Sequence, residues 1–305
     1  MIKKTLYFGN PAYLSVRQLQ LVLRLPKDEV NEIRSENFNQ NDEHTIPIED
    51  IGVLVLDNGR ITITHGLIEA LLENNVAIIT CDKHRMPVGL MLPLCGNTTQ
   101  SERFREQINA SLPLKKQLWQ QTIQSKITNQ ARILNECRGV EIRNMLKWVN
   151  DVRSGDADNL EGRAAVYYWA NLFDNFLRNR EGDSPNNLLN YGYAILRAVI
   201  ARALVSSGLL PTIGIFHHNR YNAYCLADDI MEPYRPYVDK LVFEMYKSGV
   251  IELDKDAKSK LLSIPVLGVK IGGKCSPLMV AAGLTTSSLY KCFKGESRRI
   301  LYPEV

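Results

Sequence analysis

The sequence predicts a two-domain α+β protein, with a β-sandwich-like, strand-rich domain at residues 1–94 and a larger all-α domain at residues 101–305. Three observations support this division. Short runs of β-branched and other apolar residues fill the first third of the chain, a polar, turn-prone stretch follows as a linker at 95–100, and beyond it apolar residues recur at helical spacing. A length of 305 residues is also typical of two domains.

The first domain is expected to contain short strands and one helix. The strand candidates are rich in leucine, valine, isoleucine and aromatic residues. The dipeptide Asn58-Gly59 lies between two of them and indicates a hairpin or a turn. Residues 65–73, HGLIEALLE, have the apolar spacing of a helix. The predicted strands are 5–8, 15–25, 51–56, 61–64, 76–80 and 87–92.

The second domain is expected to consist of helices alone. Its longest stretch without proline or glycine, 114–137, predicts a long helix, and the most apolar stretch, 188–206, predicts the central one. A proline directly after Glu232 removes an amide donor and predicts a kink at that point of a helix spanning 226–247. The other predicted helices are 101–109, 140–152, 159–176, 256–263 and 277–293.

Composition narrows the functional class. A formal charge of +4 permits a nucleic-acid partner without requiring one. The six cysteines contain no C-x-x-C pair, which excludes a zinc-ribbon pattern and is typical of thiols in a reducing cytoplasm. No signal peptide follows the N-terminal lysines, and no apolar run approaches the roughly 20 residues that span a bilayer. We therefore expect a cytoplasmic protein without a membrane partner.

Residues that carry chemistry concentrate in the segment 214–236. An apolar approach there leads to His217 and His218, and Asp229 and Glu232 follow three positions apart, on one helix face. The histidines and carboxylates are equally compatible with a packed, structural cluster. As ligands, one imidazole with carboxylates and no thiolate would suit Mg²⁺ or Mn²⁺.

Glu161 is a further candidate in the first turns of the helix predicted at 159–176. A carboxylate at that place also stabilises the helix dipole by about 0.3–1 kcal/mol, so position alone leaves a structural role open. Other polar residues would either contact DNA or serve as turn caps and solvated charges. These are Arg163, Asn219, Arg220, Asn222, Lys115 and Lys116, with Lys126, Arg132 and Arg143 continuing the row of positive charges.

Three separated motifs resemble those of the CRISPR adaptation integrases, which insert new spacers into CRISPR arrays. The segment EGRAA at 161–165 resembles the one with the family's first metal ligand, and the glycine–apolar run before His217 resembles the one with the histidine. The segment DIMEPYRP at 229–236 resembles the box with the last ligand. The Asn-Gly segment and DKHRMP at 82–87 also resemble the type II branch, whose loci carry an RNA-guided effector nuclease.

The resemblance implies a metal-dependent DNA integrase and endonuclease in which Glu161, His217 and Glu232 hold Mg²⁺ or Mn²⁺. Asp229 would be a supporting carboxylate beside them. The doublet leaves open whether His217 or His218 is the ligand, and we favour His217 because Gly-Ile-Phe precedes it. In this family a 3′-hydroxyl of the pre-spacer attacks a phosphodiester at the boundary of the repeat.

The resemblance also implies partners. They are double-stranded DNA, as pre-spacer and as repeat, a second copy of the chain, and a small ferredoxin-like protein whose dimer bridges two dimers of this chain. The effector nuclease is a further candidate partner. The domain at 1–94 would serve dimerisation and partner contact, and the helical domain would carry the site. Two other functions remain open, a non-catalytic DNA-binding assembly subunit and a stand-alone branched-DNA nuclease.

Overall fold

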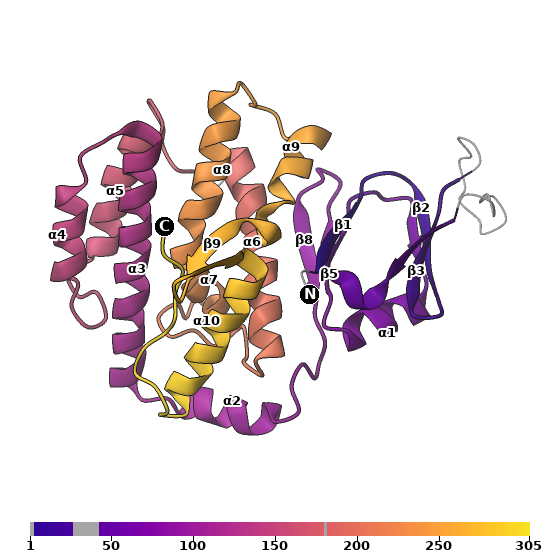
Figure 1. The fold of residues 1–305 in the computed structure, drawn as a ribbon, viewed down its shortest axis with the longest axis horizontal. Helices are drawn as coiled ribbons and strands as arrows, with labels where there is room; N and C mark the ends of the chain where they lie inside the picture. The colour runs from indigo at the N-terminus through magenta and orange to yellow at the C-terminus, as the bar shows by residue number, and fades with distance from the viewer. Residues whose placement is uncertain (1–2, 27–42, 180–181) are drawn as a thin grey trace. The chain divides into compact units, whose positions relative to one another are not determined.

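The computed structural model describes residues 3–26, 43–179 and 182–305. The chain divides into two compact units, Met1–Leu94 and Cys95–Val305. Strands dominate the first unit and helices the second, which confirms the predicted strand-rich N-terminal and helical C-terminal regions (Figure 1).

The first unit contains two four-stranded sheets and one helix within its described residues. Its elements are β1 (Lys4–Phe8), β2 (Ala12–Arg17), β3 (Gln20–Arg24), β4 (His44–Pro47), β5 (Ile51–Leu56), β6 (Ile61–Ile63), α1 (His65–Glu73), β7 (Ala77–Cys81) and β8 (Pro87–Met91). One sheet has the order β1-β5-β7-β8, parallel except for the β7–β8 pair. The other has the order β4-β3-β2-β6, antiparallel except for β2–β6.

One apolar cluster joins both sheets to α1. It includes Leu14 of β2, Leu54 of β5, Leu71 of α1 and Ile78 of β7, all buried. Burying such a side chain stabilises the fold by about 1.5–3 kcal/mol. Strand β5 has parallel neighbours on both edges and is buried along most of its length, and central strands of this kind have continuous apolar sequences. The sandwich arrangement of the two sheets stays a prediction.

One strand prediction in this unit is wrong. The range 15–25 is not one strand, because Gln18 and Leu19 adopt positive φ values of 50° and 58° and turn the chain from β2 into β3. Of the two alternatives for Asn58-Gly59, the structure has the turn and not the hairpin, since β5 and β6 belong to different sheets. Both edges of β5 are already occupied by β1 and β7, so β6 pairs with β2 instead.

The second unit contains every helix predicted from the periodicity. Its helices are α2 (Gln100–Asn109), α3 (Leu112–Arg138), α4 (Arg143–Asp151), α5 (Leu160–Leu172), α6 (Asn186–Ser206), α7 (Cys225–Met231), α8 (Arg235–Lys247), α9 (Lys255–Leu261) and α10 (Leu278–Phe293), with short 3₁₀ turns η3 (Glu232–Tyr234) and η4 (Ile264–Val266). Helix α6 is central and packs against α7, α8 and α10, as predicted (Figure 1). By length and composition it could cross a membrane, but 72% of its apolar window is buried inside the unit.

The prediction of an all-α second domain is wrong. Strands β9 (Gly268–Ile271) and β10 (Lys274–Pro277) form an antiparallel hairpin, and Lys270 of β9 also bridges to Glu304. Gly272 and Gly273 close the hairpin with φ values of 56° and 77°, a conformation that residues with a Cβ rarely adopt. Strands of four residues between helices carry too little alternation to be recognised from the sequence.

The predicted break in the long helix is confirmed. Helix α7 ends at Met231, the 3₁₀ turn η3 begins at Glu232, and α8 begins at Arg235. Pro233 and Pro236 lack backbone N–H groups, so neither could continue the hydrogen-bond ladder of α7. The break places Glu232 at a turn between two helices instead of on the face of one.

Candidate functional site

Glu161 lies in the first turn of α5, and two side chains determine where that helix begins. The Asp156 carboxylate accepts hydrogen bonds from the backbone N–H of Leu160 at 2.9 Å and of Glu161 at 3.0 Å. The Asn159 side chain accepts from the N–H of Gly162 at 3.2 Å. These bonds satisfy N–H groups that have no partner within the helix. They fix Glu161 at the positive end of the helix dipole, where a carboxylate is stabilised.

Glu232 and Glu161 converge on one ammonium group. Nζ of Lys126, on α3, lies 2.6 Å from Oε1 of Glu161 and 2.6 Å from Oε2 of Glu232. The other oxygen of Glu232 pairs with Arg235 at 3.1 Å. The side chains of Lys126 and Glu232 are 9% and 4% exposed, so this cluster is largely removed from water. Two carboxylates from distant parts of the chain therefore share a single cation.

The cluster stays charged despite its burial. Burial alone would lower the pKa of Lys126, but Glu232 and Glu161 raise it above its ordinary value. Burial likewise opposes ionisation of Glu232, yet Arg235 and Lys126 lower its pKa on balance. Oε2 of Glu232 lies 2.6 Å from this ammonium, so Lys126 pairs directly with both carboxylates.

His217 is held in place by Asp229 of α7. The fully buried Asp229 carboxylate accepts from the backbone N–H groups of Ile215, Phe216 and His217 at 2.7, 3.0 and 3.2 Å. It also lies 2.6 Å from Nδ1 of His217, and this hydrogen bond raises the pKa of the imidazole. Burial raises the pKa of Asp229 in turn. With Nδ1 engaged, the Nε2 atom of His217 is the one available to a ligand.

The loop before His217 requires glycine at position 214. A Cβ on Gly214 would overlap the carbonyl oxygen of His217 and would lie 2.7 Å from Oδ2 of Asp229. Trp119 of α3 completes the support, because its fully buried ring stacks on Phe216 at 4.2 Å and meets the edge of His217 at 5.6 Å. Asp229 and Trp119 therefore fix the imidazole from two directions.

The structure brings Glu161, His217 and Glu232 into one electrostatic environment. The bond to Asp229 raises the pKa of His217 most, burial opposes this effect, and both glutamates add smaller increases. Asp229 lies beside His217, where the sequence led us to expect a supporting carboxylate. His218 is exposed, and its Nδ1 donates to the carbonyl oxygen of Phe216 at 2.7 Å. It lies outside the cluster.

The loop residues expected to contact DNA have different surroundings. Arg220 is exposed and lies over the ring of Tyr221, 4.6 Å from its centroid. Asn219 closes a turn by accepting from the N–H of Tyr221 at 3.0 Å. Asn222 donates to Asp228 at 2.7 Å. These bonds shape the loop and leave Arg220 as its exposed cation.

The helical candidates for DNA contact lie elsewhere in the unit. Arg163 is exposed on α5 near the ring of Trp148, 5.9 Å from its centroid. Lys115 and Lys116 lie near the start of α3, half-buried and exposed respectively. Lys126, expected to continue their row on a solvated face, is instead buried against the two glutamates. That expectation is corrected, because charge alone does not reveal which face of a helix a lysine occupies.

Sequence reasoning missed Trp119, Arg235, Asp156 and the role of Lys126 in the site. A signal for Lys126 was present. It lies three residues after Ile123 and seven after Trp119, both fully buried, and so on the apolar stripe of α3. A lysine on such a stripe must find a negative partner.

The donor set fits a divalent cation. Among the described residues, no group of three or more His, Cys, Asp or Glu side chains forms a ready-made metal site. Even so, two carboxylates reach one cation, the ammonium of Lys126, and His217 presents Nε2. Oxygen-rich sets with one imidazole suit Mg²⁺ or Mn²⁺.

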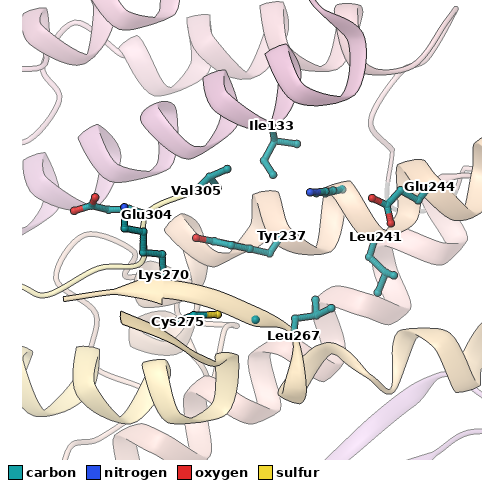
Figure 2. A pocket seen from close by; sticks show the side chains of 11 residues that line it. Ile133, Tyr237, Leu241, Glu244, Leu267, Lys270, Cys275, Glu304 and Val305 are labelled. Atoms are coloured by element: carbon teal, nitrogen blue, oxygen red, sulfur yellow. The ribbon is translucent and has the colours of Figure 1, made fainter. Parts of the chain in front are cut away.

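Two cavities lie along other faces of α3. One, of about 360 Å³, lies between α3, α8 and the β9–β10 hairpin, and Tyr237, Lys270 and Glu304 line it (Figure 2). The other, of about 650 Å³, is a polar groove between α3 and the segment after α10. Neither is lined by Glu161, Glu232 or His217. The site described above is therefore a buried charge cluster and not one of these cavities.

Comparison with known proteins supports a common origin over most of the chain. A model of the family described as CRISPR associated protein Cas1 matches residues 8–264. The chain is 36% identical over 256 residues to the CRISPR-associated endonuclease Cas1 of Neisseria meningitidis serogroup C (strain 8013), covering 83% of this chain and 79% of that protein.

Solved structures share the fold. A casposase bound to integration product aligns with a TM-score of 0.76 at 20% identity, covering 98% of this chain and 92% of the other. A Cas6-RT-Cas1–Cas2 complex aligns with a TM-score of 0.74 at 19% identity, covering 100% of this chain and 36% of the other. At such identities the likeness concerns the fold alone.

Proposed function

The chain belongs to the Cas1 family of CRISPR-associated proteins, and from this premise we propose that it is a divalent-metal-dependent DNA integrase and endonuclease that inserts spacer DNA into a CRISPR array. The observation that carries the proposal is the convergence of Glu161 and Glu232 on one cation, each 2.6 Å from the same Nζ atom. The 36% identical relative is named an endonuclease, which supports chemistry at DNA phosphodiesters.

The ligands proposed for Mg²⁺ or Mn²⁺ are Glu161, Glu232 and Nε2 of His217. When bound, the ion supplies positive charge that neutralises the phosphate under attack and favours deprotonation of the attacking hydroxyl. The protein contributes orientation. Arg235 holds the second oxygen of Glu232, and Asp229 holds the imidazole through Nδ1, so the donor atoms need little reorganisation.

The proposed reaction exchanges one phosphodiester for another. The 3′-hydroxyl of a pre-spacer attacks the phosphorus at a repeat boundary, a new P–O bond forms, and the P–O bond to the 3′ oxygen of the nucleotide flanking the repeat breaks. The hydroxyl proton passes to solvent, and the displaced 3′ oxygen takes one up. Because one phosphodiester replaces another, no nucleotide triphosphate is consumed. Water in place of the hydroxyl gives strand cleavage. Because no protein nucleophile takes part, the rate depends chiefly on positioning of both DNAs.

The proposed assembly extends beyond one chain. Two dimers of this protein would be bridged by a dimer of a small ferredoxin-like partner and would grip pre-spacer and repeat DNA together. The occurrence of a Cas1–Cas2 complex among the structural neighbours supports this arrangement. The unit Met1–Leu94 would provide dimerisation and partner contact, with the RNA-guided effector nuclease as a further partner in a type II locus. The proposed compartment is the cytoplasm.

Strand transfer by ligand variants tests the proposal. Glu161→Gln, His217→Ala and Glu232→Gln should each lower half-site integration in Mn²⁺ by at least about a hundredfold, because each removes a donor to the ion. The assay would use a repeat-containing duplex with the small partner, and fluorescence anisotropy would follow DNA binding. His218→Ala is the matched control and should retain integration.

Each alternative function predicts a different pattern. Loss of DNA binding together with integration in every ligand variant would favour an assembly subunit with a structural charge cluster. Cleavage of branched DNA without the partner, combined with no integration in its presence, would favour a stand-alone nuclease.

A further inference from the structure

The chemistry proposed above gives no task to Lys126. Its ammonium nevertheless contacts one oxygen of each glutamate at 2.6 Å, and its side chain is only 9% exposed. A lysine of α3 thus occupies the position where the proposed ligands converge. An ion that binds Glu161 and Glu232 therefore meets this ammonium first.

A buried ammonium is costly unless it is paired, and two carboxylates that face each other repel. Lys126 pairs with Glu161 and Glu232 at once, so the carboxylates offset the cost of burying the ammonium, and the ammonium offsets the repulsion between the carboxylates. Arg235 helps only Glu232, through Oε1. The lysine therefore contributes to the stability of the protein when no metal is bound.

Lys126 and a divalent ion cannot use these oxygens together. Mg²⁺ takes carboxylate oxygens as ligands, and Glu161 and Glu232 would have to offer it the same carboxylates that now pair with Nζ. An ammonium beside a divalent cation would also meet strong repulsion. The lysine stem is flexible, so the ammonium can withdraw. Arg235 contacts the other oxygen of Glu232 and is not in competition.

We propose that Lys126 is a resident cation that occupies the two-glutamate site in the metal-free protein and lowers its affinity for divalent ions by competition. This inference rests on the proposed metal site. Its consequence is that ion binding exchanges one cation for another: the ammonium leaves Glu161 and Glu232, and the ion takes its place.

The test measures Mn²⁺ affinity of the full chain without DNA, by calorimetry and by electron paramagnetic resonance of free Mn²⁺. Lys126→Met keeps the length of the stem and removes the charge, so Mn²⁺ should bind roughly a hundredfold more tightly, in line with the cost of leaving buried carboxylates unpaired. Lys126→Arg retains a cation and should not gain affinity. Lys147→Met, at an exposed lysine of α4, is the control and should match the wild type.

Thermal denaturation gives a readout that is independent of activity. Metal-free Lys126→Met should melt below the wild type, and Mn²⁺ should raise its Tm by more than it raises that of the wild type. If Lys126→Met does not fold without metal, the same measurements on Lys126→Gln test the competition instead. Failure of both neutral variants to fold at any Mn²⁺ concentration would make the lysine purely structural and overturn the inference.

The outcomes separate this inference from the proposed function. If the wild type binds Mn²⁺ through Glu161 and Lys126→Met binds it no more tightly, competition is refuted while the metal site stands. If none of the proteins binds Mn²⁺ in a manner lost in Glu161→Gln, the metal site itself fails and the inference fails with it.

Discussion

Asp229 orients His217 by accepting hydrogen bonds from the imidazole and from three backbone N–H groups of the loop before α7. All these donors need a carboxylate, because an amide would present its own N–H groups to some of them. The residue therefore determines which nitrogen of His217 is available as well as the path of the loop.

Asp229→Asn should weaken Mn²⁺ binding by about 10–100-fold, because partners of this kind set the orientation and basicity of a metal-bound imidazole. Calorimetry with Mn²⁺ would measure the change. Asp228→Asn is the matched control at the adjacent position, where the carboxylate pairs with Arg197 at 2.7 Å and does not touch His217. Equal losses in both variants would contradict the orienting role of Asp229.

At this scale the sequence predicts the residue types of the site better than their surroundings. The proposed ligands Glu161, His217 and Glu232 stand out through motif resemblance. Lys126 is marked only by its place on the apolar stripe of α3, and Trp119 not at all, because their contacts arise only where α3 packs against α5 and the loop before α7. A contact between side chains far apart in sequence leaves no local pattern.

Helix α3 supports two different surfaces. One faces the charge cluster through Lys126, and another lines the polar groove of about 650 Å³ through Gln121, Gln124 and Thr128. Gln121 accepts from the N–H of Ile300 at 3.0 Å and donates to the carbonyl oxygen of Arg298 at 2.9 Å, which holds the segment after α10 on α3. The exposed side chains of Arg298 and Arg299 line the same groove, and guanidinium groups beside amides and hydroxyls are suited to a phosphate backbone.

Replacing Arg298 and Arg299 together by alanine should weaken DNA binding about equally for all sequences and reduce the salt slope of log Kd by about 2, since phosphate contacts act through released counterions. Anisotropy titrations over a range of NaCl concentrations would measure it. Arg138→Ala is the control, because that guanidinium pairs with Asp174 at 2.6 Å. An unchanged slope in the double variant would exclude the groove as a phosphate site.

At the scale of elements, long helices are predictable and short strands are not. Helices α3 and α6 are recognisable because several turns repeat the same apolar spacing. The β9–β10 hairpin offers four residues per strand, and the pairing of β6 with β2 depends on which edges are already filled. Turn chemistry at Asn58-Gly59 indicates a change of direction but not the partner of the next strand.

The helical unit is connected through its interior by a second polar cluster. Asp239 of α8 accepts hydrogen bonds from the hydroxyl groups of Tyr168 of α5, at 3.1 Å, and Tyr193 of α6. Burial raises the pKa of Asp239 to about 7, and the bonds from both tyrosines only partly oppose this effect. Three helices thus meet at a carboxyl group that titrates near neutral pH.

This pKa predicts how the stability of the whole molecule depends on pH. The unfolded chain releases the Asp239 proton near pH 4, whereas the native protein retains it up to about pH 7. The contribution of this proton to the free energy of unfolding is therefore complete below pH 4 and is lost as the pH rises to 7. Relative to Asp239→Asn, the wild type should lose up to roughly 4 kcal/mol of unfolding free energy over that range.

Urea denaturation of both proteins at several pH values between 4 and 8 would measure the difference, with the amide variant removing the background of other groups. A difference between the two proteins that stays constant across this range would refute the assigned titration.

The pairing of Lys126 and Arg235 with Glu161 and Glu232 makes this cluster formally neutral. A divalent ion entering it would leave a surplus of positive charge, and a polyanion is drawn to such a surplus. The ion and the nucleic acid would then bind cooperatively. If the bound ion increases the affinity for nucleic acid by some factor, bound nucleic acid must increase the affinity for the ion by the same factor. Such an enzyme would bind nucleic acid tightly only after the divalent ion had bound.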